Sequence, residues 1–308
     1  MIGTLLQMFS LVAIGLLWSR WQPGQLETET SRKVLAGSVY YLFLPALVLN
    51  VLWRAPLGID TVKIMVVAAT GVFVALAASY AVCRLARSPR QTAGAVILAA
   101  SWPNATYLGL PVLENTFGPW AGSIALQYDL FACTPLVLTL GVFIANAYGT
   151  AGKPDNPIKV LLGVPPLWAA LLGLIFNLAD VPMWSWLEGL LRIMGAAVVP
   201  LMLVSVGMAL RQGFGQFRHL PLVIPAMIVK LFLMPLAALG VATLLGFSGD
   251  WRIALVLEGA MPSMMFGIVL ADRFGLDTGV YASALTVTTL LSLVTLPLWF
   301  QWAGGIGF

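Results

Sequence analysis

Ten long apolar runs determine what this chain can fold into. A helix that crosses a bilayer needs about 20 mostly apolar residues, and runs of this kind recur along the whole sequence. The linkers between them are too short to form a separate soluble domain. The sequence therefore predicts an all-α integral membrane protein with ten transmembrane helices. The runs lie at residues 2–19, 32–53, 62–84, 91–117, 119–147, 157–178, 183–210, 218–246, 251–274 and 277–303.

Composition excludes several classes of function. Only 9% of the residues are charged and 60% are hydrophobic, whereas soluble domains carry about 25% charged residues, so a soluble enzyme is excluded. The single histidine, His219, argues against chemistry that needs several histidines. Cys83 and Cys133 lie inside apolar runs, which argues against a disulfide or a thiolate metal site. We expect no metal, no cofactor and no nucleic-acid partner.

Basic residues predict which side of the membrane each linker faces. Eleven fall on one side of the predicted spans and three on the other. Because Lys and Arg concentrate in cytoplasmic linkers, we expect both termini on the non-cytoplasmic side of the cell inner (plasma) membrane. The cytoplasmic set is Arg20, Arg32, Lys33, Arg84, Arg87, Arg90, Lys153, Lys159, Arg211, Arg218 and Arg273, and the opposite set is Arg54, Lys63 and Arg252.

The two halves of the chain resemble each other. LFLPALVLNVLWR matches AVVPLMLVSVGMALR, and WPNATYLGLP matches MPSMMFGIVL. Pro45 thereby aligns with Pro200 and Pro103 with Pro262, at offsets of 155 and 159 residues, each about half of the chain. Five helices per half is an odd number, so the second half must be inverted in the membrane. Inverted repeats with broken helices are typical of secondary transporters.

Prolines interrupt the fourth and ninth predicted helices near their middles. A proline inside a helix removes one backbone hydrogen bond and crowds the carbonyl four residues earlier. Asn104 follows Pro103 and Ser263 follows Pro262, and both residue types are good N-caps. Each could start a second half-helix whose positive end attracts an anion. A simple kink without a binding role is the alternative, but two kinks at equivalent positions favour a binding site.

These motifs resemble the auxin efflux carrier family, which contains plant PIN-type carriers and bacterial organic-acid permeases. PNATYLGLP, PLMLVSVGMAL and VKLFLMP carry the resemblance, which covers nearly the whole chain. It implies that helices 4 and 9 cross at their prolines and that residues beside the prolines contact the substrate carboxylate. The residues concerned are Pro103, Asn104, Pro262 and Ser263. From their positions beside these motifs, we also expect Ala105, Tyr107 and Met264 at the substrate site.

The resemblance also implies a division of the chain. A scaffold domain would comprise residues 1–60 and 156–215 with helices 1, 2, 6 and 7. A transport domain would comprise residues 61–155 and 216–308 with helices 3–5 and 8–10. It further implies a homodimer. Plant carriers tend to have asparagine where this chain has Ser263, and this departure argues against indole-acetate as the substrate.

Ionisable residues inside the predicted spans are candidates for ion coupling, because such residues are costly in a bilayer. Glu258 stands one turn before Pro262, while Asp129 and Lys230 lie midway along their runs. Two interpretations stay open for Asp129 and Lys230: a role in H⁺ or Na⁺ coupling, or a buried structural ion pair. For Glu258 we favour coupling. Glu188 and Arg192, four residues apart, are expected to form a local pair.

The sequence thus predicts a secondary carrier for small organic anions that works by alternating access of the elevator type. A sodium- or proton-coupled symporter or antiporter, of the kind found among bile-acid symporters and sodium/proton antiporters, is the second hypothesis. An intramembrane enzyme is disfavoured, since the usual protease and hydrolase motifs are missing from the sequence.

Overall fold

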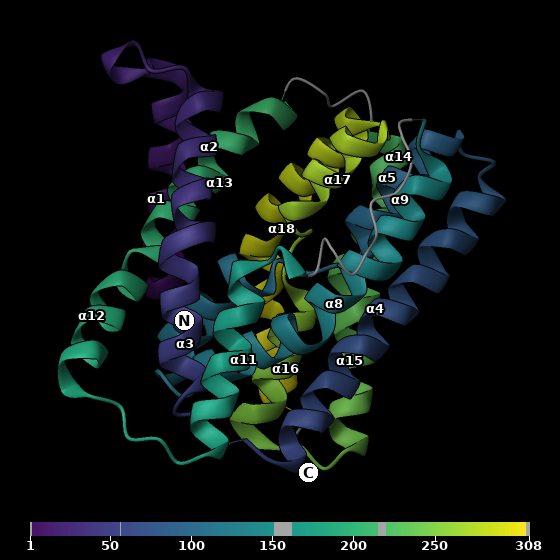
Figure 1. Cartoon of the computed structure of the whole chain (residues 1–308). Coiled ribbons are helices and arrows are strands. Elements are labelled where there is room, and N and C mark those ends of the chain that lie inside the picture. Colours follow the sequence, from purple (N-terminus) through teal and green to yellow (C-terminus); the bar gives the residue numbers. More distant parts are fainter. Residues whose placement is uncertain (1, 56, 151–161, 215–219, 306–308) are drawn as a thin grey trace.

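The computed structural model describes residues 2–55, 57–150, 162–214 and 220–305, and this part of the chain is helical apart from turns and one isolated β-bridge (Figure 1). Six helical stretches in it are long and apolar enough to cross a membrane. The prediction of an all-α membrane protein is confirmed at this level. The six stretches are Thr28–Leu52, Ile59–Leu85, Ala121–Tyr148, Ser185–Ala209, Val223–Leu244 and Thr278–Gly305.

Helical structure is present in each of the ten predicted runs. In chain order the α-helices are α1 (Ile2–Trp21), α2 (Thr28–Ser38), α3 (Leu44–Leu52), α4 (Ile59–Leu85), α5 (Arg90–Ser101), α6 (Leu110–Phe117), α7 (Ala121–Tyr128), α8 (Thr134–Leu136), α9 (Val142–Tyr148), α11 (Pro165–Leu178), α12 (Ser185–Ala196), α13 (Val198–Phe214), α14 (Leu220–Ile228), α15 (Met234–Leu244), α16 (Gly249–Ala260), α17 (Phe266–Phe274) and α18 (Thr278–Gly305).

Short π-helical segments connect many of these helices without a break in direction. They are η2 (Val39–Phe43), η3 (Ala105–Gly109), η4 (Asp129–Cys133), η5 (Val137–Gly141) and η7 (Val229–Leu233). Four of them are followed by a proline as the second residue after the segment, at Pro45, Pro111, Pro135 and Pro235. Because proline lacks an N–H and crowds the carbonyl four residues earlier, the wider π turn relieves the conflict. Such π turns often occur at functional sites.

Indole groups satisfy carbonyls at two of these turns. Leu231 lies four residues before Pro235, which has no N–H to offer, and its carbonyl accepts a hydrogen bond from the Trp299 Nε1 at 2.8 Å. The Cys133 carbonyl accepts one from the Trp102 Nε1 at 3.2 Å. In an apolar surrounding an unsatisfied carbonyl is costly, so these tryptophans stabilise the irregular turns.

The fourth and ninth runs are broken at their prolines, as predicted. Trp102 and Met261 have extended ψ angles of 126° and 146°, the conformation that a following proline imposes. The two breaks lie side by side, and Pro103 forms an antiparallel β-bridge with Ser263. The Asn104 N–H donates to the Pro262 carbonyl at 2.8 Å, and the Met264 N–H donates to the Trp102 carbonyl at 3.0 Å.

The helices form two groups in Figure 1. On the left lie α1, α2, α3, α11, α12 and α13; on the right lie α4, α5, α9, α14 and α15, with α16, α17 and α18 between. In the left group α1 crosses α13 in direct backbone contact, because a methyl group at Gly15 or Gly207 would collide with the backbone of the other helix. Small residues permit this close approach between apolar helices.

Hydrogen bonds at the helix ends bring residues of the predicted basic side together. The Arg90 guanidinium donates to the Ala147 carbonyl at 3.0 Å, and the Thr150 N–H donates to the Phe274 carbonyl at 3.0 Å. The ends of α5, α9 and α17 that carry Arg90 and Arg273 therefore meet. Lys153, Lys159, Arg218 and His219, with the side chain of Arg211, lie outside the described residues.

Candidate functional site

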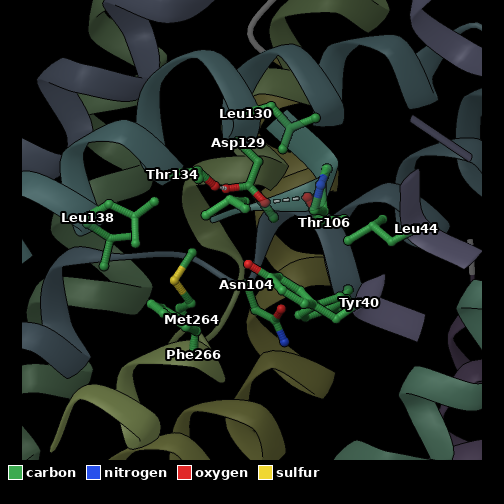
Figure 2. A pocket seen from close by; sticks show the side chains of 15 residues that line it. Tyr40, Leu44, Asn104, Thr106, Asp129, Leu130, Thr134, Leu138, Met264 and Phe266 are labelled. Carbon is green, nitrogen blue, oxygen red and sulfur yellow. Dashed lines mark hydrogen bonds between the residues drawn. The ribbon is translucent and has the colours of Figure 1, made fainter. Parts of the chain in front are cut away.

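A small cavity of about 70 Å³ lies beside the paired helix breaks (Figure 2). Five residues predicted from the sequence line it: Asn104, Ala105, Tyr107, Asp129 and Met264. Figure 2 shows Asp129 between Thr106 and Thr134, with Asn104 and Met264 across the cavity. The rest of the lining is mainly apolar and aromatic, so a polar ligand here would be held by few groups in a largely dry environment.

Asn104 is the junction between the break and the second half-helix. Its N–H is used in the bridge to Pro262, and its carbonyl accepts from the N–H groups of Leu108 and Gly109 at 3.2 and 3.0 Å. The side chain is 3% exposed and makes no hydrogen bond within the described part of the chain. Because the backbone is fixed on both sides, the amide is held at the cavity wall and is available to a ligand.

The side chain of Asp129, from η4, lies at the N-terminus of the half-helix that follows Asn104. Its carboxylate accepts hydrogen bonds from the Thr106 hydroxyl, from the Thr106 N–H and from the Thr134 hydroxyl, the last at 3.0 Å. The sequence predicted that the free N–H groups here would receive a substrate anion. Instead, a carboxyl group of the protein takes one of them, and the bridge uses those of Asn104 and Met264. A ligand in the cavity therefore meets both an amide and a carboxyl group.

Ser263, the counterpart of Asn104, does not line the cavity. It is fully buried, and Thr288 on α18 accepts a hydrogen bond from its N–H at 3.2 Å and contacts its hydroxyl at 3.1 Å. Pro103 and Pro262 contribute backbone groups to the bridge between the two breaks and do not line the cavity. The structure thus separates the two predicted anion contacts.

Lys230 and Glu258 are fully buried but also lie outside the cavity lining. The Lys230 Nζ donates to the Gly259 carbonyl at 3.1 Å. Both carboxylate oxygens of Glu258 lack a hydrogen-bond partner among the described residues, and they pack against Gly109, where a methyl group would collide with them. Asp129 bonds to two threonines rather than to Lys230, so the buried ion pair considered from the sequence is not formed here.

The expected pair between Glu188 and Arg192 is wrong. Glu188 instead binds Arg54, with N–O distances of 2.7 and 2.5 Å. Both carboxylate oxygens of Glu188 contact the Arg54 guanidinium, the two-point geometry that makes such pairs strong.

Sequence reasoning missed Thr106, Thr134 and Tyr40 as lining residues. Thr106, Asp129 and Tyr40 lie in π-helical segments, and Thr134 directly follows one. The prolines that follow these segments were a usable signal, since each predicts an irregular turn near the site.

A larger cavity of about 420 Å³ adjoins this site. It extends to Arg32 and Arg273. The lining residues that it shares with the smaller cavity are Tyr40, Tyr107, Leu138, Val164 and Phe266. The smaller cavity therefore adjoins a cavity that reaches basic residues of the predicted cytoplasmic side, and Tyr40 and Tyr107 line both cavities.

Comparison with known proteins identifies related sequences. A profile of the membrane transport protein family matches residues 1–300. An uncharacterized transporter from Methanothermobacter thermautotrophicus is 35% identical over 278 residues, which is 88% of this chain and 89% of the relative. The uncharacterized transporter MJ1031 of Methanocaldococcus jannaschii is 30% identical over 214 residues, 67% of each chain. The uncharacterized transporter YfdV of Escherichia coli is 25% identical over 218 residues, covering 69% of this chain and 68% of the relative.

Proposed function

Since this chain belongs to the membrane transport protein family, the auxin efflux carrier family that its motifs indicated, we propose that it is a secondary carrier for small organic anions such as carboxylates. The observation that carries this proposal is the cavity at the paired helix breaks, where the amide of Asn104 faces a largely apolar space. An amide donor in a dry site suits a carboxylate. The function is transport, and we expect no enzymatic activity.

The proposed architecture has ten spans in two inverted five-helix repeats. Six apolar helices meet the length of a span, and the two broken runs fall short of it because prolines divide them. The grouping of the helices supports a scaffold domain of residues 1–60 and 156–215 and a transport domain of residues 61–155 and 216–308. Movement of the second against the first gives alternating access in the inner membrane, and a homodimer would anchor the scaffold.

The proposed coupling places the anion and a proton in one cavity. Two unit charges about 4 Å apart repel by roughly 4 kcal/mol at an effective dielectric constant of about 20. A hydrogen bond to a charged group contributes about 1.5–3 kcal/mol. Repulsion by ionised Asp129 therefore exceeds the attraction of Asn104, so the anion binds when Asp129 carries a proton. The anion and the proton then travel together.

Sodium coupling is the second candidate, favoured by one observation at Glu258. Both oxygens of this buried carboxylate lack a partner in the described part of the chain, and such a group needs a proton or a cation beside it.

Uptake into proteoliposomes tests the proposal. Labelled carboxylic acids should accumulate in vesicles that contain the protein, and an imposed pH gradient should drive uptake if protons are coupled. Asn104→Ala should lower affinity by about one to two decades, because it removes a hydrogen bond to a charged group. Ser263→Ala is the matched control, and its effect should be smaller because that hydroxyl points to Thr288. Native affinity in a folded Asn104→Ala protein would place the anion elsewhere and refute this site.

A further inference from the structure

A second polar cavity, of about 510 Å³, lies between α3 and α12 on one side and α6 and α7 on the other. It shares no lining residue with the Asn104 cavity. Its lining includes Arg54, which belongs to the predicted non-cytoplasmic set. We call it the outer cavity, and neither the family match nor the predicted anion site assigns it a role.

The outer cavity contains an exposed basic side chain and a half-buried acidic one that form no ion pair with each other. Arg54 is neutralised by Glu188. Arg192, from α12, and Glu114, from α6, also line the cavity, and neither has an ion-pair partner within 4.0 Å among the described residues. The Glu114 carboxylate packs on bare backbone, since a methyl group at Gly122 would collide with it. One wall therefore offers a cationic donor and the opposite wall a carboxyl group.

Two neutral groups add further acceptors. The Asn50 Oδ1 is buried and has no hydrogen-bond partner within the described ranges. The Ser123 hydroxyl donates its proton to the Trp120 carbonyl at 2.8 Å, so only its lone pairs remain for a ligand. Leaving a buried acceptor without a donor costs free energy. The cavity thus has more acceptors than its own donors satisfy.

We propose that the outer cavity is a second substrate-binding site that selects small carboxylates bearing a hydrogen-bond donor on the adjacent carbon, that is, 2-hydroxy or 2-amino acids. The carboxylate binds Arg192, and the hydroxyl or ammonium group donates to Glu114 or Asn50. An acid without this donor brings its charge close to Glu114 and leaves the acceptors unsatisfied. The substrate class rests on the proposed transport of organic acids, whereas the site itself rests on the groups that line the cavity.

Titration calorimetry on the full-length protein in detergent tests the inference with propionate, lactate and alanine. These acids share one carbon skeleton and differ in the group on the second carbon: hydrogen, hydroxyl or ammonium. Lactate or alanine should bind about tenfold or more tightly than propionate, the effect of one hydrogen bond to a charged group. Which of the two binds more tightly identifies the donor. Equal affinity for all three acids would overturn the inference.

Variants of residues that line the outer cavity test whether the acids bind there. Arg192→Gln should weaken lactate or alanine binding about tenfold or more, while Arg192→Lys should retain part of it. Glu114→Gln should reduce the preference over propionate severalfold. Arg84→Gln, on the exposed end of α4 and away from the cavity, is the matched control and should change nothing. Native affinity in a folded Arg192→Gln protein would contradict the proposal, with the melting temperature of each variant reporting its folding.

The two sites are distinguished in the Asn104→Ala background. The preference for lactate or alanine should persist there, because Asn104 does not line the outer cavity. Loss of the preference with this substitution would assign all binding to the Asn104 cavity and overturn the inference. Conversely, absence of uptake by proteoliposomes together with binding that depends on Arg192 would refute the proposed transport and support the outer site.

Discussion

Asp129 is the residue whose charge would control anion binding in the Asn104 cavity. Its carboxylate caps the half-helix through Thr106 and reaches Thr134, so it lies where we propose that the anion binds. The proposed transport cycle depends on its protonation.

Asp129→Asn should remove the pH dependence of anion binding. In the native protein, affinity should fall as pH rises, because the deprotonated carboxylate repels the substrate. The amide cannot ionise, so affinity should stay near its low-pH value at all pH values. Binding of a transported acid measured across acidic and neutral pH checks this. An unchanged pH profile would exclude Asp129 as the coupled group.

Glu258→Gln should weaken the dependence of uptake on pH or sodium while the protein remains folded. The change replaces an ionisable carboxyl by an amide of nearly the same shape, at a fully buried position whose oxygens have no partner among the described residues, so little packing is lost. Uptake driven by imposed ion gradients, with the melting temperature measured alongside, is the readout. If ion dependence persists in the variant, Glu258 has a structural role only.

Asn104 was predictable because it follows a mid-span proline, and Asp129 because a carboxylate stands out in an apolar run. Tyr107 and Met264 were expected only as neighbours of the two prolines. It could not place Ser263, whose hydroxyl is turned to Thr288 on a helix remote in sequence. Nor could it show that Asp129 lines the cavity and Lys230 does not, since the direction of each side chain depends on how η4 and η7 pack against the rest of the molecule.

At the level of elements, proline-linked π turns determine where side chains of the site point. The breaks were predictable, because a proline disfavours helical conformation at the residue before it. The β-bridge between the breaks was not, since it requires two segments about half a chain apart to meet in register.

Trp299→Phe should destabilise the protein by about 1–3 kcal/mol, because the carbonyl of Leu231 loses its indole donor and stays buried. In domains of up to about 250 residues each kcal/mol corresponds to roughly 2–4 °C in melting temperature, so a drop of several degrees is expected. Trp302→Phe, on the same helix but 49% exposed, is the matched control. Equal melting temperatures for the two variants would show that the indole bond contributes nothing.

At the level of the whole molecule, the charge asymmetry predicts topology. A reporter that is active only in the cytoplasm should be inactive when fused to the C-terminus, and active when inserted in the linker with Arg87. The physical cause is the eleven-to-three distribution of basic residues. An active C-terminal fusion would reverse the orientation and would move the outer cavity to the cytoplasmic face.

The bridge between the two breaks also bears on electrical insulation. Two interrupted helices at the centre of a membrane protein would leave a row of unpaired peptide groups along which water and ions could leak. Here the N–H groups of Asn104 and Met264 are each matched by a carbonyl of the other break. Separating them would expose polar groups that cost several kcal/mol each in hydrocarbon. The same contact that lies beside the site therefore leaves neither of these N–H groups unpaired, which reduces the polar path through the two breaks.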